Sequence, residues 1–66
     1  MLRLRPREID YLSHFTRGMT AKDVARVEGV SPFTVNVTIQ NARERNGAAN
    51  IAHLVAMAVA EGLVKP

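Results

Sequence analysis

Two side-chain amides stand four residues apart in the middle of this 66-residue chain, at Asn36 and Gln40. An amide carries one donor beside one acceptor, which complements the N6 donor and the N7 acceptor that adenine presents in the major groove of DNA. Val37 adds an apolar group that can contact the methyl group of thymine. The chemistry that these residue types could perform is therefore the recognition of bases, and the alternative is that Asn36 and Gln40 are solvated polar side chains of a helix.

Residues capable of catalysis are arranged unfavourably. Ser13 and His14 are adjacent, so on a helix their side chains point about 100° apart and cannot form a nucleophile–base pair. Asp10 lies four residues before His14, a spacing that predicts a weak surface pair. The second histidine, His53, has no metal-binding spacing to His14, and the chain has no cysteine. We therefore expect no enzymatic activity, no metal site and no cofactor.

Prolines, glycines and capping residues predict helices over residues 6–17, 21–28, 32–45 and 51–61. The strongest start signals are Ser31 followed by Pro32, and Thr20 followed three residues later by Asp23, which is a variant of the capping box. Asn50 can cap the last helix. No stretch alternates long enough to predict a strand, so the predicted fold class is all-α.

The second and third predicted helices are joined by a short turn that contains Gly29, which is the arrangement of a helix-turn-helix. On the third helix, Val35, Thr38, Ile39 and Ala42 share one face and predict a buried stripe. The opposite face carries Phe33, Asn36, Val37, Gln40 and Glu44. This polar face is the one that we expect to meet DNA.

Basic residues are concentrated in the first two-thirds of the chain. Eight of its nine Lys and Arg residues and five of its six Asp and Glu residues lie in residues 1–45. The formal net charge of +3 is therefore located in this part of the chain. A basic surface fits a polyanion. Arg3 and Arg5 fit a phosphate-contacting arm and a solvated, frayed terminus equally well, whereas Arg7 begins a helix and is the better candidate for a phosphate contact.

Short stretches from residue 4 to residue 58 follow a family pattern in register: Leu4–Glu8, Arg17–Ala25, Gly29–Ser31, Thr34–Val35, Asn41, Gly47 and Leu54–Ala58. This pattern resembles the LuxR/GerE-type helix-turn-helix domain. The resemblance implies one four-helix domain over residues 1–66, with the helix-turn-helix over about 20–46 and a dimerisation helix over about 50–62. It implies base contacts by Asn36, Val37 and Gln40. Contacts with the DNA backbone are expected from Arg7, Lys22, Thr34, Arg43 and Arg45.

The chain departs from the family pattern at several positions. Arg5 stands where the family usually has Thr or Ser, so the first helix lacks its customary cap. Asn36 and Thr38 stand where Lys and His are favoured, which alters the bases that are read. Apolar residues within 48–51 replace polar or basic ones and alter the expected dimer geometry. No sensory or receiver domain is visible.

The predicted fourth helix is apolar on more than one side. One stripe consists of Ile51, Leu54, Val55 and Ala58, and a second consists of Ala52, Ala56, Val59 and Leu63. A wide core stripe is one explanation. Self-association through the second stripe is the explanation that we favour.

These features predict a DNA-binding transcriptional regulator that binds double-stranded DNA as a homodimer. The alternative is a small interaction module that pairs through its fourth helix with a larger regulator of the same family and inhibits it. The N-terminus has no signal-peptide pattern, and the apolar run over residues 51–60 is too short to span a membrane. We therefore expect the protein to act in the bacterial cytoplasm, on the nucleoid or as a phage product, without a membrane partner.

Overall fold

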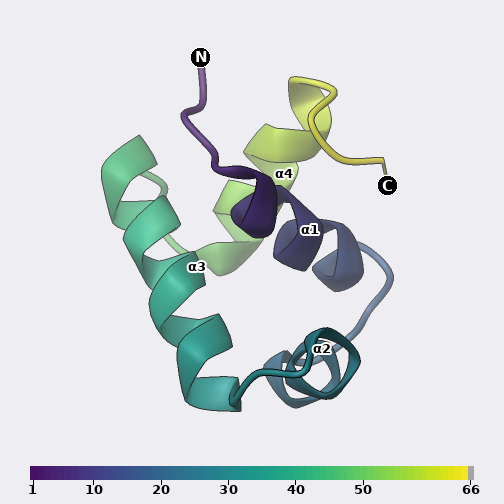
Figure 1. The fold of residues 1–66 in the computed structure, drawn as a ribbon. Helices are drawn as coiled ribbons and strands as arrows, with labels where there is room; N and C mark the ends of the chain where they lie inside the picture. Colours follow the sequence, from purple (N-terminus) through teal and green to yellow (C-terminus); the bar gives the residue numbers. More distant parts are fainter. Residues whose placement is uncertain (66) are drawn as a thin grey trace.

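The computed structural model describes residues 1–65, which form four helices and no strand: α1 (Pro6–Phe15), α2 (Ala21–Glu28), α3 (Pro32–Asn46) and α4 (Ile51–Ala60) (Figure 1). The predicted all-α class is therefore confirmed. α1 is shorter than expected, because it ends at Phe15 and a turn leads on to Gly18, whose φ is +81°. None of the described helices combines the length and the apolar character needed to cross a membrane.

The predicted caps fix where the helices begin. Thr20 Oγ1 accepts from the Asp23 amide at 3.2 Å, and the Asp23 carboxylate accepts from the Thr20 amide at 3.1 Å, which completes the capping box. Ser31 Oγ accepts from the Thr34 amide at 3.0 Å at the start of α3. Between these two starts, Gly29 ends α2 in the left-handed conformation, with φ +71°. The turn of the helix-turn-helix is thus defined by short-range contacts.

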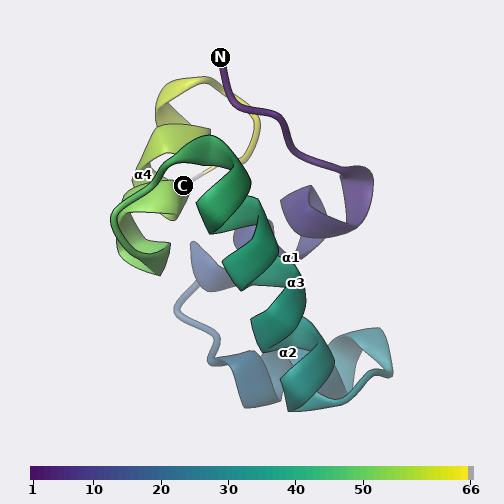
Figure 2. The same cartoon turned by 90° about the vertical axis from the view of Figure 1, so that its left-hand side faces the viewer.

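α3 is the central element of the fold, because it packs against each of the other three helices. Of the predicted stripe, Val35, Ile39 and Ala42 are buried. Thr38 is only half-buried, because it lies at the edge of the stripe and lines a hollow at the surface. The remaining core side chains come mainly from the facing helices and include Tyr11, Leu12, Val24, Leu54 and Ala58. Figure 2 shows α3 in front of the other helices along its whole length. Its outer face is consequently open.

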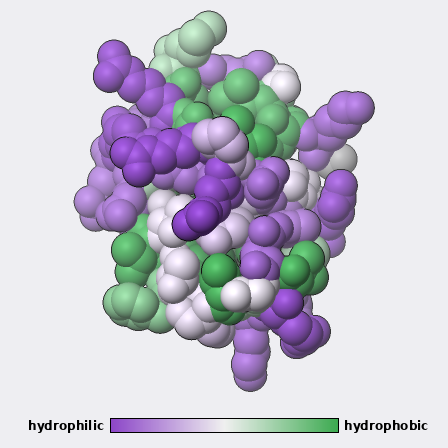
Figure 3. Space-filling view, viewed as in Figure 1, coloured by the Kyte–Doolittle hydropathy of each residue, from purple (hydrophilic) through white to green (hydrophobic). Residues whose placement is uncertain are grey.

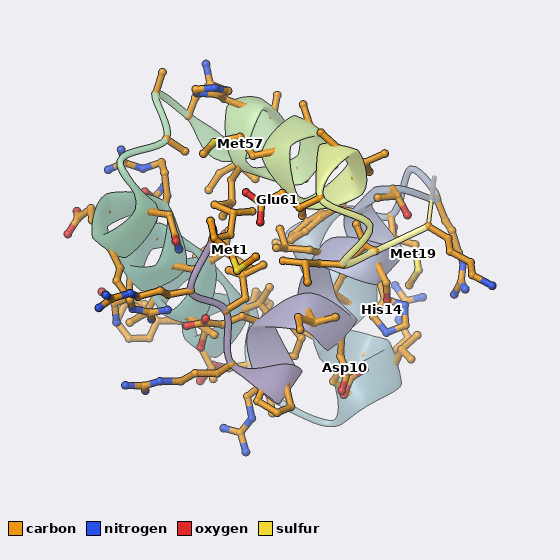
Figure 4. The ribbon with its side chains drawn as sticks, turned by 90° about the horizontal axis from the view of Figure 1, so that it is seen from above. Met1, Asp10, His14, Met19, Met57 and Glu61 are labelled. Carbon is orange, nitrogen blue, oxygen red and sulfur yellow. The ribbon has the colours of Figure 1, made fainter. Side chains whose placement is uncertain are left out.

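The segment before α1 is tied to the ends of α3 and α4. The Leu2 amide donates to the Glu61 carboxylate at 3.0 Å, and Figure 4 shows Met1 and Glu61 close together. The Arg3 amide donates to Asn46 Oδ1 at 2.6 Å, and Asn46 Nδ2 donates back to the Arg3 carbonyl at 3.0 Å. The backbone of this segment is therefore held in place, which corrects the alternative of a frayed terminus at Arg3.

Candidate nucleic-acid interface

The open face of α3 presents the three residues expected to contact bases. Asn36, Val37 and Gln40 are all exposed, and 40% of the Val37 surface is accessible. They lie on two successive turns of one helix, opposite the buried stripe of α3. The packing that buries the stripe therefore also turns these side chains outward together.

Phe33 lies beside these three residues, and the sequence analysis did not assign it a function. Phe33 is 75% exposed and lies one turn before Val37 on the same face of α3. Figure 3 shows hydrophobic surface at the lower left, where α3 begins, and mostly hydrophilic surface above it. The signal that could have identified Phe33 is its place among polar residues on the face opposite the core.

Gln40 and Arg43 form a side-chain pair on this helix. Arg43 Nε donates to Gln40 Oε1 at 2.8 Å. Arg43 Nη1 donates to the Ala48 carbonyl at 3.0 Å, and Arg43 Nη2 lies 3.4 Å from a carboxylate oxygen of Glu44. Each nitrogen of this guanidinium therefore has an acceptor within the protein, although the sequence predicted that Arg43 contacts the DNA backbone.

Arg45 is also engaged within the protein. Its Nη1 and Nη2 atoms donate to the two carboxylate oxygens of Glu8 at 2.9 and 2.7 Å, and Nη1 also donates to the Arg3 carbonyl at 2.7 Å. Glu8 is only 3% exposed. The pair therefore joins the start of α1 to the end of α3, with one partner buried.

Glu8 also replaces the missing helix cap. Its carboxylate accepts from the Arg5 amide at 2.8 Å, which is the Glu half of a capping box. The hydrogen bonds from Arg45 hold the pKa of Glu8 below its ordinary value of 4.5, while burial acts in the opposite direction. The same bonds raise the pKa of Arg45. The carboxylate at this helix start is therefore ionised at neutral pH.

A basic hollow of about 470 Å³ lies between the start of α1 and the flank of α3. Arg5, Pro6, Arg7 and Glu8 line it on the α1 side, and Thr38, Asn41 and Arg45 line it on the α3 side, so three arginines and one carboxylate border it. It adjoins the open face of α3, since Asn41 follows Gln40 directly. Cationic and hydrogen-bonding groups in this arrangement are chemically suited to a phosphate of a DNA strand that borders the groove.

Two other residues that are expected to contact the DNA backbone, Lys22 and Thr34, lie in the first turns of helices. Lys22 is exposed in the first turn of α2. Thr34 is half-buried in the first turn of α3, and its Oγ1 lies 2.9 Å from Ser31 Oγ. When the Ser31 hydroxyl is the donor in this contact, the Thr34 hydroxyl keeps its own proton and can donate it to a phosphate.

The second stripe of α4 lies mainly at the surface. Ala52 and Ala56 are exposed, whereas Val59 is half-buried and packs against the core. Leu63 is also exposed, but it lies outside α4, because the helix ends at Ala60 and the chain turns at Gly62, whose φ is +73°. In the first stripe, Leu54 and Ala58 are fully buried. α4 thus has an inner stripe in the core and an outer stripe that is largely exposed.

The sequence interpretation of His14 was wrong in one respect. His14 Nε2 lies 2.8 Å from Glu28 Oε2 of α2 and does not pair with Asp10, because the packing of α1 on α2 brings Glu28 closer. Ser13 Oγ donates to the Asp10 carbonyl at 2.7 Å. Figure 4 places Asp10 and His14 on α1, far from Glu61. Within residues 1–65, no three His, Asp or Glu side chains gather as a metal site.

Comparison with protein families identifies the family to which this four-helix chain belongs. The GerE model, described as bacterial regulatory proteins of the luxR family, matches residues 3–58. The chain belongs to the luxR family. Its α2 and α3 are the helix-turn-helix of a luxR-family DNA-binding domain of transcriptional regulators.

This luxR-family chain is also similar to a curated protein. The transcriptional activator protein TraR of Rhizobium radiobacter is 36% identical to it over 61 residues, which cover 92% of this chain and 26% of TraR. The chain therefore spans about a quarter of the length of that relative. No solved structure matches the chain significantly.

Proposed function

We propose that this luxR-family protein is a sequence-specific transcriptional regulator that reads the major groove of double-stranded DNA with α3. The observation that carries the proposal is the open face of α3, where Asn36, Val37 and Gln40 stand together on a helix whose opposite side is buried. The major groove of B-DNA admits an α-helix, and a helix held rigidly by its core can present these groups at fixed positions. The 36% identity to a transcriptional activator, over an alignment that covers 92% of the chain, adds support.

The proposed base contacts follow from the chemistry of each side chain. Asn36 and Gln40 each offer an amide to adenine, and Val37 offers a methyl group to thymine. Phe33, one turn before Val37, extends the apolar part of this surface. The preferred half-site is therefore expected to contain adenine and thymine at the positions that α3 contacts.

Contacts with the DNA backbone are proposed for Arg7, Lys22 and Thr34. Arg7 lines the basic hollow, and the other two lie in the first turns of α2 and α3. The remaining two expected contacts, Arg43 and Arg45, donate instead to protein acceptors. We assign structural roles to this second pair, and the salt dependence of DNA binding by their variants tests that assignment.

We further propose that the protein acts as a homodimer through the outer stripe of α4, made up of Ala52, Ala56 and Val59, together with Leu63, which follows the helix. Exposure of most of this apolar stripe supports the proposal. A dimer with two-fold symmetry would bind inverted half-sites whose centres are roughly 10 bp, or a multiple of that, apart.

Selection of binding sites from a randomised duplex library tests the function directly. We expect an inverted repeat with a preferred adenine in each half-site, and Asn36→Ala should abolish the preference at one position. Asn41→Ala is a matched control, because it removes the same amide from the flank of α3 and should leave the selected motif unchanged. A motif with no preferred adenine would refute this assignment of α3.

A second candidate function rests on the same outer stripe of α4. The protein could pair through it with a larger luxR-family regulator and block that partner, and either role would be exercised in the bacterial cytoplasm. The two functions differ in a gel-shift assay with genomic fragments. A regulator would bind certain fragments saturably and with preference, whereas an inhibitor would prefer none and would co-sediment with the larger regulator.

A further inference from the structure

We infer that Arg43 is a positioning residue for Gln40: it fixes the direction in which the amide is offered to DNA. This inference rests on the proposed reading of the major groove by α3. It assigns to Arg43 a role different from the backbone contact expected from the sequence.

The guanidinium of Arg43 is anchored at one end by the main chain. Nη1 donates at 3.0 Å to the carbonyl of Ala48, a buried residue that follows the left-handed turn at Gly47. Only 25% of the Arg43 side chain is exposed. A planar guanidinium held in this way has its other donors in fixed directions, because its five N–H groups form a rigid fork.

The fixed donor that faces Gln40 is Nε, at 2.8 Å from Oε1. Arginine has no acceptor, so only the oxygen end of the amide can face it. The bond therefore selects one of the two amide orientations and turns the Nε2 group the other way. Oε1 keeps a second lone pair, so the oxygen remains able to accept from adenine N6 while Nε2 donates to N7.

The pairing also restricts Gln40 before DNA arrives. Glutamine is among the side chains that lose most rotamer freedom when ordered, and an interface residue that is already ordered loses less on binding. Gln40 is exposed, and the side-chain hydrogen bond that the structure gives it is the one with Arg43, one turn further along α3. The geometry thus makes base discrimination by Gln40 dependent on Arg43.

A phosphate contact and a positioning role give different signatures. Removing a phosphate contact weakens binding to all sequences alike and reduces the slope of log K against log salt by about 0.9. Removing a positioning residue reduces discrimination at one base and leaves the slope unchanged. Arg43→Lys separates the two, because it keeps the positive charge and loses the planar fork.

The experiment uses the full chain and four duplexes that carry each base pair at the position where Gln40→Ala abolishes the preference. We expect Arg43→Lys to reduce the preference for the best base about five- to tenfold at unchanged salt slope, which is a large part of what one bidentate contact provides. Arg43→Met should have the same effect on preference, and neither change should reduce it further in the Gln40→Ala background. Arg26→Lys, an exposed arginine of α2, is the matched control and should change nothing.

Several results would overturn the inference. A uniform loss of affinity with a slope smaller by about 0.9 in Arg43→Met would make Arg43 a phosphate contact. An unchanged preference in both Arg43 variants, with thermal unfolding confirming that they fold, would also refute it. If Gln40→Ala alters no preference at any position, the proposed reading by Gln40 fails, and the inference fails with it.

Discussion

Replacing Glu8 with glutamine removes one charge while keeping the shape of the side chain, so it isolates the ion pair that joins α1 to α3. The carboxylate accepts two hydrogen bonds from Arg45 and one from the Arg5 amide. A glutamine can keep one accepting oxygen in this place, but its amide nitrogen then faces a guanidinium donor. At least one charge-assisted hydrogen bond is lost at a site where Glu8 is 3% exposed.

Glu8→Gln should lower the free energy of unfolding by about 2 kcal/mol, because the loss of one hydrogen bond to a charged group typically has this magnitude. A chain of this size has a total stability on the order of 3–10 kcal/mol, so the loss is a large fraction of it. At roughly 4–8 °C per kcal/mol, Glu8→Gln should lower Tm by about 8–16 °C. Circular dichroism during thermal unfolding measures this shift. Glu44→Gln, at an exposed position, is the matched control and should leave Tm nearly unchanged.

The pH dependence provides a second test of the same pair. Because the pKa of Glu8 is lowered in the folded protein, its contribution is fully present above its ordinary value of 4.5 and is lost as pH falls through the depressed value. The difference in stability between the wild type and Glu8→Gln should therefore shrink as pH falls below about 4.5. A constant difference in urea midpoint from pH 7 to pH 3 would contradict this account. Arg45→Met should weaken this pH dependence, since the hydrogen bonds from Arg45 are the largest cause that lowers the pKa of Glu8, while the bond from the Arg5 amide remains.

Other predictions concern DNA binding and assembly. Arg7→Ala and Lys22→Ala should each weaken binding to all duplexes alike and reduce the salt slope by about 0.9, and unchanged slopes would remove them from the backbone contacts. Replacing the thymine nearest Val37 with deoxyuridine should weaken binding of the wild type but not of Val37→Ala, and an equal loss in both would refute the methyl contact. Ala56→Asp should give a monomer in sedimentation without unfolding, whereas Val59→Asp should also lower stability, because Val59 packs partly against the core. A persisting dimer in Ala56→Asp would exclude this face of α4.

Features set within a few residues could be predicted from the sequence. The capping box of Thr20 and Asp23 depends on residues three apart, and the two faces of α3 depend only on helical periodicity around Val35 and Ile39. The exposed position of Asn36 and Gln40 follows directly from that periodicity. The candidate base-contacting face could therefore be predicted from the sequence alone.

Pairings between helices could not be predicted in this way. Glu8 and Arg45 are 37 residues apart, and they meet because α1 packs on α3. His14 has an acid four residues away on its own helix, yet it pairs with Glu28 across the contact with α2. The partner of a long charged side chain depends on which neighbours packing brings within reach, and helical periodicity contains no information about that.

The division of α3 into a buried and an open face has a consequence for how this domain can change. Substitutions on the open face remove little packing, and surface changes of this kind usually alter stability by no more than about 0.5 kcal/mol. On the proposed reading of DNA by α3, the sequences that the domain binds can therefore diverge almost independently of its ability to fold. On the same proposal, α3 is a practical site for redirecting the protein to a chosen DNA sequence, with Arg43 and Gln40 exchanged as a pair.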